Sequence, residues 1–218
     1  MKSLEIIFRY VYNMQNMAVE IILKNFDHWI KGLGPLGARK AVFNHIRDIP
    51  YYLVPQIEDP LVWAESILRT SKASCTPKHY LLGFLFTKLG IPIDYVTYPF
   101  KWSEQPINYP AKIKELAQGS PTGYHLSCKA QIKGRWVLVD ATWDSGLKKS
   151  GFPVNDNWDG LSNTLNAVVP IEEVIHSTLE DRLSYVREKK KLIPEEQKAI
   201  YAEFITQFNL WLESLRRQ

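Results

Sequence analysis

The sequence has few cysteines, no long apolar run and no strong excess of one charge. Its 218 residues include only Cys75 and Cys128, which cannot form the disulfide framework of a small secreted protein. The 27 Lys and Arg residues are mixed with 23 Asp and Glu residues, whereas a nucleic-acid-binding domain is usually more strongly basic. No uncharged stretch approaches the ~18 apolar residues of a membrane span. We therefore expect neither a nucleic acid nor a membrane as partner.

Several other signals are missing as well. The first 22 residues have no continuous apolar segment, because Glu5, Arg9 and Asn13 interrupt it, and a secretory signal needs such a segment. A Gly-rich phosphate loop, an internal repeat and a low-complexity tract are also lacking, so no motif supports nucleotide binding. These absences predict a soluble, cytoplasmic protein.

What remains is a globular composition, 45% hydrophobic and 23% charged, typical of one folded domain. Apolar periodicity predicts helices over about 4–30, 38–48 and 60–69, strands over 91–98, 124–132 and 135–142, and helices over 171–187 and beyond 194. Residues 99–122 and 145–166 read as long loops. Helices followed by strands and again helices indicate an α+β fold with an antiparallel sheet.

One further predicted helix is apolar on nearly every side, which is typical of a buried central helix. Thr76-Pro77 marks its start, and Gly90 and Pro92 mark its end. Cys75 lies immediately before its first turn, where unpaired N–H groups and the helix dipole stabilise a thiolate. The alternative is that Cys75 is a small buried apolar residue, as free cysteines often are.

The strands over 124–132 and 135–142 predict a hairpin with Lys133-Gly134 as its turn. Side chains alternate along a strand, so with this turn one face carries His125 and Asp140, about 7–8 Å apart on the diagonal. The opposite face is apolar and faces the core: Leu126, Cys128, Ala130, Ile132, Val137, Val139 and Ala141.

A second acid, Asp144, lies four residues after Asp140, so alternation along the strand places it on the same face as Asp140. Asp140 lies in the more apolar strand, where a buried carboxylate requires a partner, and this favours Asp140 as the partner of His125. A cysteine, a histidine and an acid together allow acyl transfer, in which the imidazole holds the thiol proton and the carboxylate orients the imidazole.

A zinc site is an alternative, because cysteine and histidine are zinc ligands and Cys75 and His79 are four residues apart on one helix. His125 and Cys128 complete the set of candidate ligands. The predicted hairpin places Cys128 on the face opposite to His125, however, so these four side chains do not converge. We therefore expect no metal.

Three segments together carry a family resemblance: FNHIRDIPYYLVP, LRTSKASCTPKHYLLGFLFTKLGIP and GYHLSCKAQIKGRWVLVDATWD. They resemble microbial-type members of the transglutaminase-like superfamily, which shares the papain-like cysteine-proteinase fold. The resemblance covers roughly residues 38–145. It implies a central helix that begins with the cysteine and packs on an antiparallel sheet, with extra helices at both ends.

We also predict a domain organisation, although the two terminal parts lie outside the resemblance and could equally wrap around the catalytic domain or form a surface for a partner. Residues 1–37 form a helical N-terminal extension, 38–170 a transglutaminase-like catalytic domain, and 171–218 C-terminal helices packed on the same domain. The chain departs from many relatives in having Ala73-Ser74 before the cysteine and Leu126-Ser127 after the histidine. These departures leave the substrate preference open, and the oligomeric state is not predicted.

The resemblance matches Cys75, His125 and Asp140 to a catalytic triad that acts through a thioester, without a metal or organic cofactor. Hydrolysis of a peptide or protein amide is favoured over cross-linking; the alternative is a non-catalytic binding or scaffold module. The aromatic residues Trp143 and Trp158 are candidates for substrate binding, although they could equally cover the sheet.

An oxyanion hole needs hydrogen-bond donors close to the nucleophile. The backbone N–H of Cys75 is the natural candidate, and no motif places a side-chain donor. Trp63 and Tyr52 are the side chains that we consider for this role.

Overall fold

The computed structural model describes residues 2–217, with side chains from residue 12 onward. Its centre is a four-stranded antiparallel sheet in the order β3-β2-β1-β4. The strands are β1 (Ile93–Phe100), β2 (Gly123–Ile132), β3 (Arg135–Val139) and β4 (Val174–His176). The predicted α+β class with an antiparallel sheet is confirmed.

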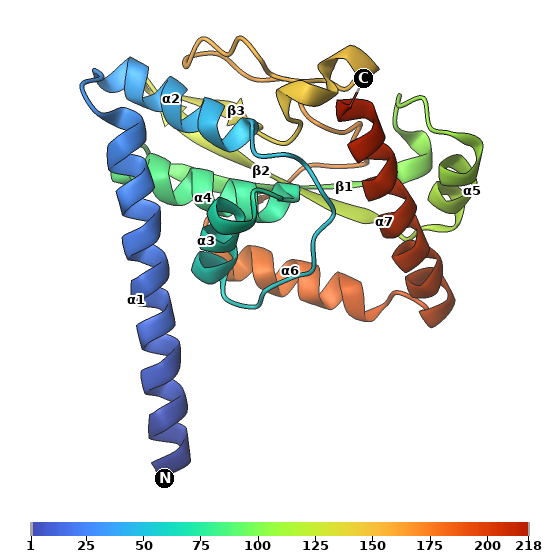
Figure 1. The fold of residues 1–218 in the computed structure, drawn as a ribbon, viewed down its shortest axis with the longest axis horizontal. Coiled ribbons are helices and arrows are strands. Elements are labelled where there is room, and N and C mark those ends of the chain that lie inside the picture. The colour runs from blue at the N-terminus through green and yellow to red at the C-terminus, as the bar shows by residue number, and fades with distance from the viewer. Residues whose placement is uncertain (1, 218) are drawn as a thin grey trace.

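Four helices precede the sheet in the sequence. They are α1 (Lys2–Ile30), α2 (Pro35–Arg47), α3 (Pro60–Thr70) and α4 (Cys75–Lys88). Helix α4 packs against β2, α3 and α2 and lies along one face of the sheet, while α1 extends away from the body of the molecule (Figure 1). The predicted central helix that begins with the cysteine and packs on the sheet is therefore present.

The starts of three helices can be compared with the local signals in the sequence, and one of them, that of α3, agrees fully. The Asp59 carboxylate caps α3 by accepting from the backbone N–H groups of Leu61 and Val62, as the Asp-Pro pair predicts. Helix α2 begins at Pro35, earlier than predicted, because proline suits the first turn of a helix. Helix α4 begins at Cys75 with Ser74 as its N-cap, so the cysteine is the first residue of the helix and not the residue before it.

The hairpin has the predicted register. Ile132 pairs with Arg135 and Cys128 with Val139. Lys133 and Gly134 both have positive φ, 49° and 75°, as a two-residue type I′ turn requires. The seven residues assigned to the apolar face all lie in one core cluster with α4.

Other boundaries differ from the prediction. The segment over 171–187 is not one helix: it holds β4 and then α6 (Leu179–Lys191). The predicted loop over 99–122 contains the 3₁₀-helix η1 (Trp102–Glu104) and helix α5 (Ala111–Gly119), and the loop after β3 contains η2 (Ser145–Ser150).

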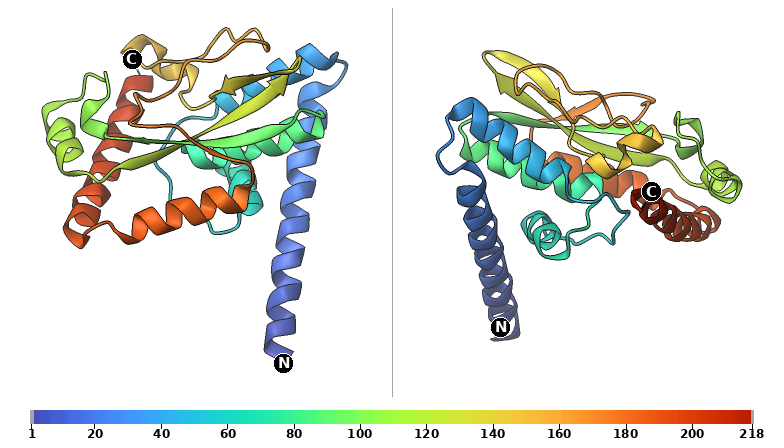
Figure 2. Two further views of the ribbon diagram at one scale, coloured as in Figure 1. Left: turned by 180° about the vertical axis from the view of Figure 1, so that it is seen from behind. Right: turned by 45° about the horizontal axis from the view of Figure 1, so that its top comes forward.

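Helix α7 (Glu195–Arg216) follows α6 and packs against α5 and η2. Its buried residues Phe204, Phe208 and Leu212 join a second core cluster with Tyr98 and Trp102. Figure 2 shows α7 at the end of the molecule away from α1, with α6 running below the sheet to join it. Among the described residues, no helix is long and apolar enough to cross a membrane.

Candidate active site

Cys75 lies at the N-terminus of α4, held there by the segment before it. The backbone of Ala73 accepts from the Tyr52 N–H at 2.9 Å and donates to the Pro50 carbonyl at 3.1 Å. The thiol is half-buried and lies where the positive end of the helix dipole favours an anion. This position suits a thiolate nucleophile.

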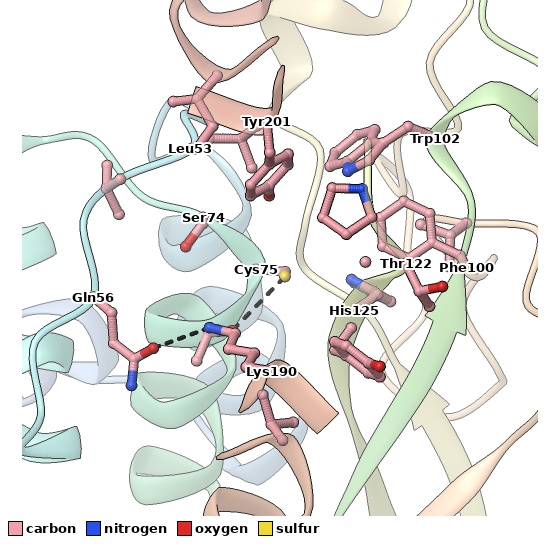
Figure 3. Close-up of a pocket in the computed structure, with 18 of the residues that line it drawn as sticks. Leu53, Gln56, Ser74, Cys75, Phe100, Trp102, Thr122, His125, Lys190 and Tyr201 are labelled. Atoms are coloured by element: carbon pink, nitrogen blue, oxygen red, sulfur yellow. Dashed lines mark hydrogen bonds between the residues drawn. The ribbon is translucent and has the colours of Figure 1, made fainter. Parts of the chain in front are cut away.

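His125 lies near the start of β2, and its Nε2 is 2.8 Å from Oδ2 of Asp140. Both side chains are almost fully buried, with exposed fractions of 2% and 1%. Because Nε2 is bonded to the carboxylate, Nδ1 is the nitrogen left for Cys75, and Figure 3 shows a His125 ring nitrogen facing the sulfur. The structure thus brings together the three residues that the sequence singled out.

Asp140 follows the last residue of β3 and is fixed by the backbone around it. Its carboxylate accepts from the N–H groups of Thr142 and Ala167, at 3.0 and 2.9 Å, while its own N–H donates to the Thr164 hydroxyl. A buried carboxylate with this many donors stays ionised. It can therefore orient and stabilise a charged imidazole.

Asp144 has a different environment from Asp140. Its carboxylate forms a two-fold contact with the guanidinium of Arg216, at 3.0 and 2.7 Å, and also accepts from the Tyr51 N–H at 2.8 Å. This clamp joins the end of α7 to the loop that follows β3. The sequence pattern placed both acids on the same face as His125. In the structure, Asp140 is the one that bonds to His125, while Asp144 bonds to Arg216.

His79 is a part of the site whose role the sequence did not reveal. Its Nδ1 donates to the Cys75 carbonyl at 2.8 Å, and its Nε2 accepts from the Ala141 N–H at 3.0 Å. Burial lowers the pKa of His79 to about 4, so the ring is neutral and joins the first turn of α4 to the residue after Asp140. The spacing of four residues from Cys75 was the available signal, and it had suggested metal chelation.

The two cysteines have opposite chemical environments. Burial alone raises the pKa of the Cys75 thiol, but the charge and hydrogen bond of His125 and the Leu126 N–H lower it below its ordinary value. Burial raises the pKa of Cys128, which lies in the core on the face away from His125 and donates to the His79 carbonyl. Only Cys75 therefore favours a thiolate.

The imidazole of His125 is the counterpart of that thiolate. Burial alone lowers its pKa, but the charges of Asp140 and Cys75 raise it to about 10. Burial alone raises the pKa of Asp140, whereas His125 holds it well below its usual range. These opposite shifts favour a thiolate–imidazolium pair beside an ionised carboxylate.

Cys75 and His125 open into a cavity of about 420 Å³. Trp143, a candidate for substrate binding, lines the cavity, and its indole N–H donates to the Ala167 carbonyl. Trp158 does not reach the cavity: it packs in the core between Phe43 and Phe86. Trp158 therefore has a packing role in the core, where its aromatic partners come from α2 and α4.

Side-chain donors for an oxyanion are less clearly marked. Of the two candidates from the sequence, Trp63 lines the cavity, whereas the Tyr52 hydroxyl donates to Glu213. Trp102, which sequence reasoning missed, also lines the cavity, and its buried Nε1 has no hydrogen-bond partner among the described residues.

The C-terminal helices form a second wall of the cavity, which sequence reasoning did not predict. Arg182 and Lys190 from α6, and Tyr201 from α7, line the cavity that Cys75 enters. Figure 3 shows Lys190 reaching Gln56 on one side of the thiol and Tyr201 above it. Their apolar periodicity predicted packing, but no local pattern indicated what these helices pack against.

Comparisons with known proteins found a similar solved structure but no family. No family model matches it, and no curated protein matches it. A solved structure that it resembles is that of a candidate cysteine protease from Cytophaga hutchinsonii, with 18% sequence identity and a TM-score of 0.42. The match covers 72% of this chain and 42% of that one, so the chain spans less than half of that protein.

Proposed function

We propose that this chain is a cysteine-dependent amide hydrolase with Cys75, His125 and Asp140 as its catalytic triad. The observation that carries the proposal is the His125–Asp140 hydrogen bond beside a thiol at a helix N-terminus, at the floor of an accessible cavity. The resemblance to the transglutaminase-like superfamily, carried by the same three residues, supports this assignment.

The first half-reaction forms a thioester. The Cys75 thiolate attacks the amide carbonyl carbon, and the oxyanion accepts hydrogen bonds from donors such as the Cys75 N–H. The C–N bond then breaks, and the proton on Nδ1 of His125 goes to the departing amine. Asp140 stabilises the imidazolium before this transfer and fixes the tautomer afterwards.

The second half-reaction releases the acyl group. His125 takes a proton from water, the hydroxide adds to the thioester carbonyl, and the C–S bond breaks to give the carboxylic acid and the starting thiolate–imidazolium pair. An amine in place of water would give transamidation instead. Because water is present in an open cavity at far higher concentration than any amine, hydrolysis of a peptide or protein amide is the reaction that we propose.

The test is the pH dependence of alkylation by iodoacetamide, read separately at Cys75 and Cys128 by peptide mass. A thiolate–imidazolium pair gives a Cys75 rate that is already high at pH 6 and nearly flat to pH 9. A thiol with the ordinary pKa of ~8.5 would instead gain about tenfold per pH unit below that value. The buried Cys128 is the internal control and should stay unmodified in the folded protein.

A Cys75 rate that follows an ordinary thiol, or that is as low as that of Cys128, would contradict the proposal. The chain would then be a non-catalytic module of the same fold, with the cavity serving to bind a partner. A positive result justifies a screen of peptide substrates by mass spectrometry, with the Cys75→Ala variant as the blank.

A further inference from the structure

The charges around the cavity are unequal. Arg182, Lys190 and Lys198 are among the residues that line it, whereas none of the lining residues in the described part of the chain is an Asp or Glu. Lys198 is paired with Glu195 at 2.5 Å. Among the described residues, neither Arg182 nor Lys190 forms an ion pair with a carboxylate, so their charges make this side of the cavity positive.

Arg182 is buried, with an exposed fraction of 4%, and its hydrogen-bond partners are neutral. Its Nη1 donates to the Tyr80 hydroxyl at 2.8 Å and its Nη2 to the Thr76 hydroxyl at 3.4 Å. Its Nε is buried without a hydrogen-bond partner among the described residues. A buried guanidinium without a carboxylate partner is costly, and an anion bound beside it would offset that cost.

Lys190 is the second cation, and unlike Arg182 it is an exposed residue. Its ammonium donates to the neutral side-chain carbonyl of Gln56 at 3.0 Å. Burial and the nearby charge of Arg182 lower the pKa of Lys190, while the negative charge of Cys75 raises it. Both cations are therefore within electrostatic range of the nucleophile. Arg182 contacts the Thr76 hydroxyl, whose oxygen is 4.0 Å from the Cys75 sulfur.

We infer that the substrate carries a carboxylate beside the amide bond that is cleaved, and that Arg182 and Lys190 bind this carboxylate. The inference rests on the proposed function and defines the substrate class: a peptide with an acidic side chain next to the scissile bond, or one whose C-terminal carboxylate lies there. Arg182 contributes the fixed charge and Lys190 a mobile one that can leave Gln56 for the ligand.

The inference can be tested before any substrate is known. Iodoacetate and iodoacetamide alkylate the same sulfur by the same displacement of iodide, but only iodoacetate carries a carboxylate. The ratio of their second-order rates at Cys75 therefore measures the preference of the cavity for an anion. The imidazolium of His125 contributes equally to the ratio in every variant in which that residue is kept.

Removing one cation should lower the iodoacetate-to-iodoacetamide ratio about fivefold to tenfold, as expected for one charge several ångströms away in a partly buried site. Arg182→Gln should have the larger effect. Lys190→Gln changes an exposed side chain whose one hydrogen bond among the described residues is to Gln56, and this variant keeps the test valid where loss of Arg182 prevents folding. Added NaCl should reduce the ratio in wild-type protein by screening.

The matched control is Lys189→Gln, the same change of charge at the neighbouring exposed position of α6, which is absent from the cavity wall. It should leave the ratio unchanged. A ratio that is also unchanged in Lys190→Gln and Arg182→Gln would overturn the inference. Because the ratio is measurable even when both rates are low, this outcome is distinct from failure of the thiolate itself.

Matched peptides then separate the two sources of the carboxylate. One pair contains Glu or Gln at each position around the amide bond, and the other has a free or an amidated C-terminus. A preference for the charged member that disappears in Lys190→Gln identifies which carboxylate is bound. Equal cleavage of both members in both pairs would overturn the inference.

Discussion

The two walls of the cavity differ in how the chain builds them. The first wall comes from the start of α4, from β2 and from the segment after β3, and it carries Cys75 and His125, with Asp140 buried behind His125. The second wall comes from α6 and α7 and carries Arg182, Lys190 and Tyr201. In the proposed enzyme, the residues that carry out the reaction and those that select the substrate therefore belong to separate parts of the chain.

The largest effect is expected on the first wall. Cys75→Ala removes the nucleophile, so amide hydrolysis should fall by about 10⁴-fold or more, while the melting temperature changes little because the residue is only half-buried. Hydrolysis of a peptide found in the substrate screen, followed by mass spectrometry, checks this. Cys128→Ala is the control and should keep full activity per folded molecule; residual hydrolysis in Cys75→Ala equal to wild type would remove this residue from the mechanism.

His125→Ala should have the next largest effect. Without the imidazolium, the pKa of the Cys75 thiol rises toward its ordinary value, because burial raises it and only the weaker effects of the Leu126 N–H, the Arg182 charge and the helix dipole still lower it. Alkylation by iodoacetamide at pH 6 should then fall by about a hundredfold. The rate should recover as the pH rises toward 9, so an unchanged pH profile would show that the two residues are not coupled.

Asp140→Asn should slow the chemistry less than either change above. The neutral amide cannot stabilise the imidazolium, so the pKa of His125 falls and the fraction of thiolate at neutral pH falls with it. We expect alkylation at pH 7 to decrease about tenfold. The measurement is the midpoint of the pH profile, which should move toward that of His125→Ala; a profile identical to wild type would exclude Asp140 as the partner.

The smallest effect on the chemistry is expected at Asp144. Asp144→Asn breaks the clamp to Arg216, which is nearly buried, and should lower the free energy of unfolding by about 3 kcal/mol. Urea titration measures this loss. Alkylation of Cys75, corrected for the folded fraction, should change by less than about twofold, because neither Asp144 nor Arg216 forms a hydrogen bond with His125. A large drop in alkylation would show that the two walls are coupled through the clamp.

The sequence predicted the first wall because local rules determine it. The Lys133-Gly134 turn set the register of the hairpin, and alternation along the strands then placed His125 and Asp140 together. Asp140 and Asp144 have the same parity, and the choice between them needed the argument that a buried carboxylate requires a partner. The structure supplied the physical reason, which is that Arg216 already neutralises Asp144.

The rest was not predictable from local patterns. Strand β4 has only three residues and lies just before α6. Its apolar residues therefore looked like part of the helix predicted over 171–187. Helix α5 lies between Pro110 and Pro121, which made the whole segment resemble a loop. The second wall depends on contacts between distant segments, and neither apolar periodicity nor charge in α6 indicates which cavity Arg182 lines.

The distance along the chain between the two walls has a consequence for folding. Arg182 contacts Thr76 across 106 residues, and Arg216 contacts Tyr51 across 165. Contacts of such high sequence separation form late, because the intervening chain must be ordered first. During synthesis, Cys75 therefore emerges long before the residues that complete its surroundings. Alkylation of Cys75 at low pH should thus accelerate during folding when His125 reaches the sulfur, whereas the preference for an anionic reagent should appear later, when α6 has packed beside Thr76.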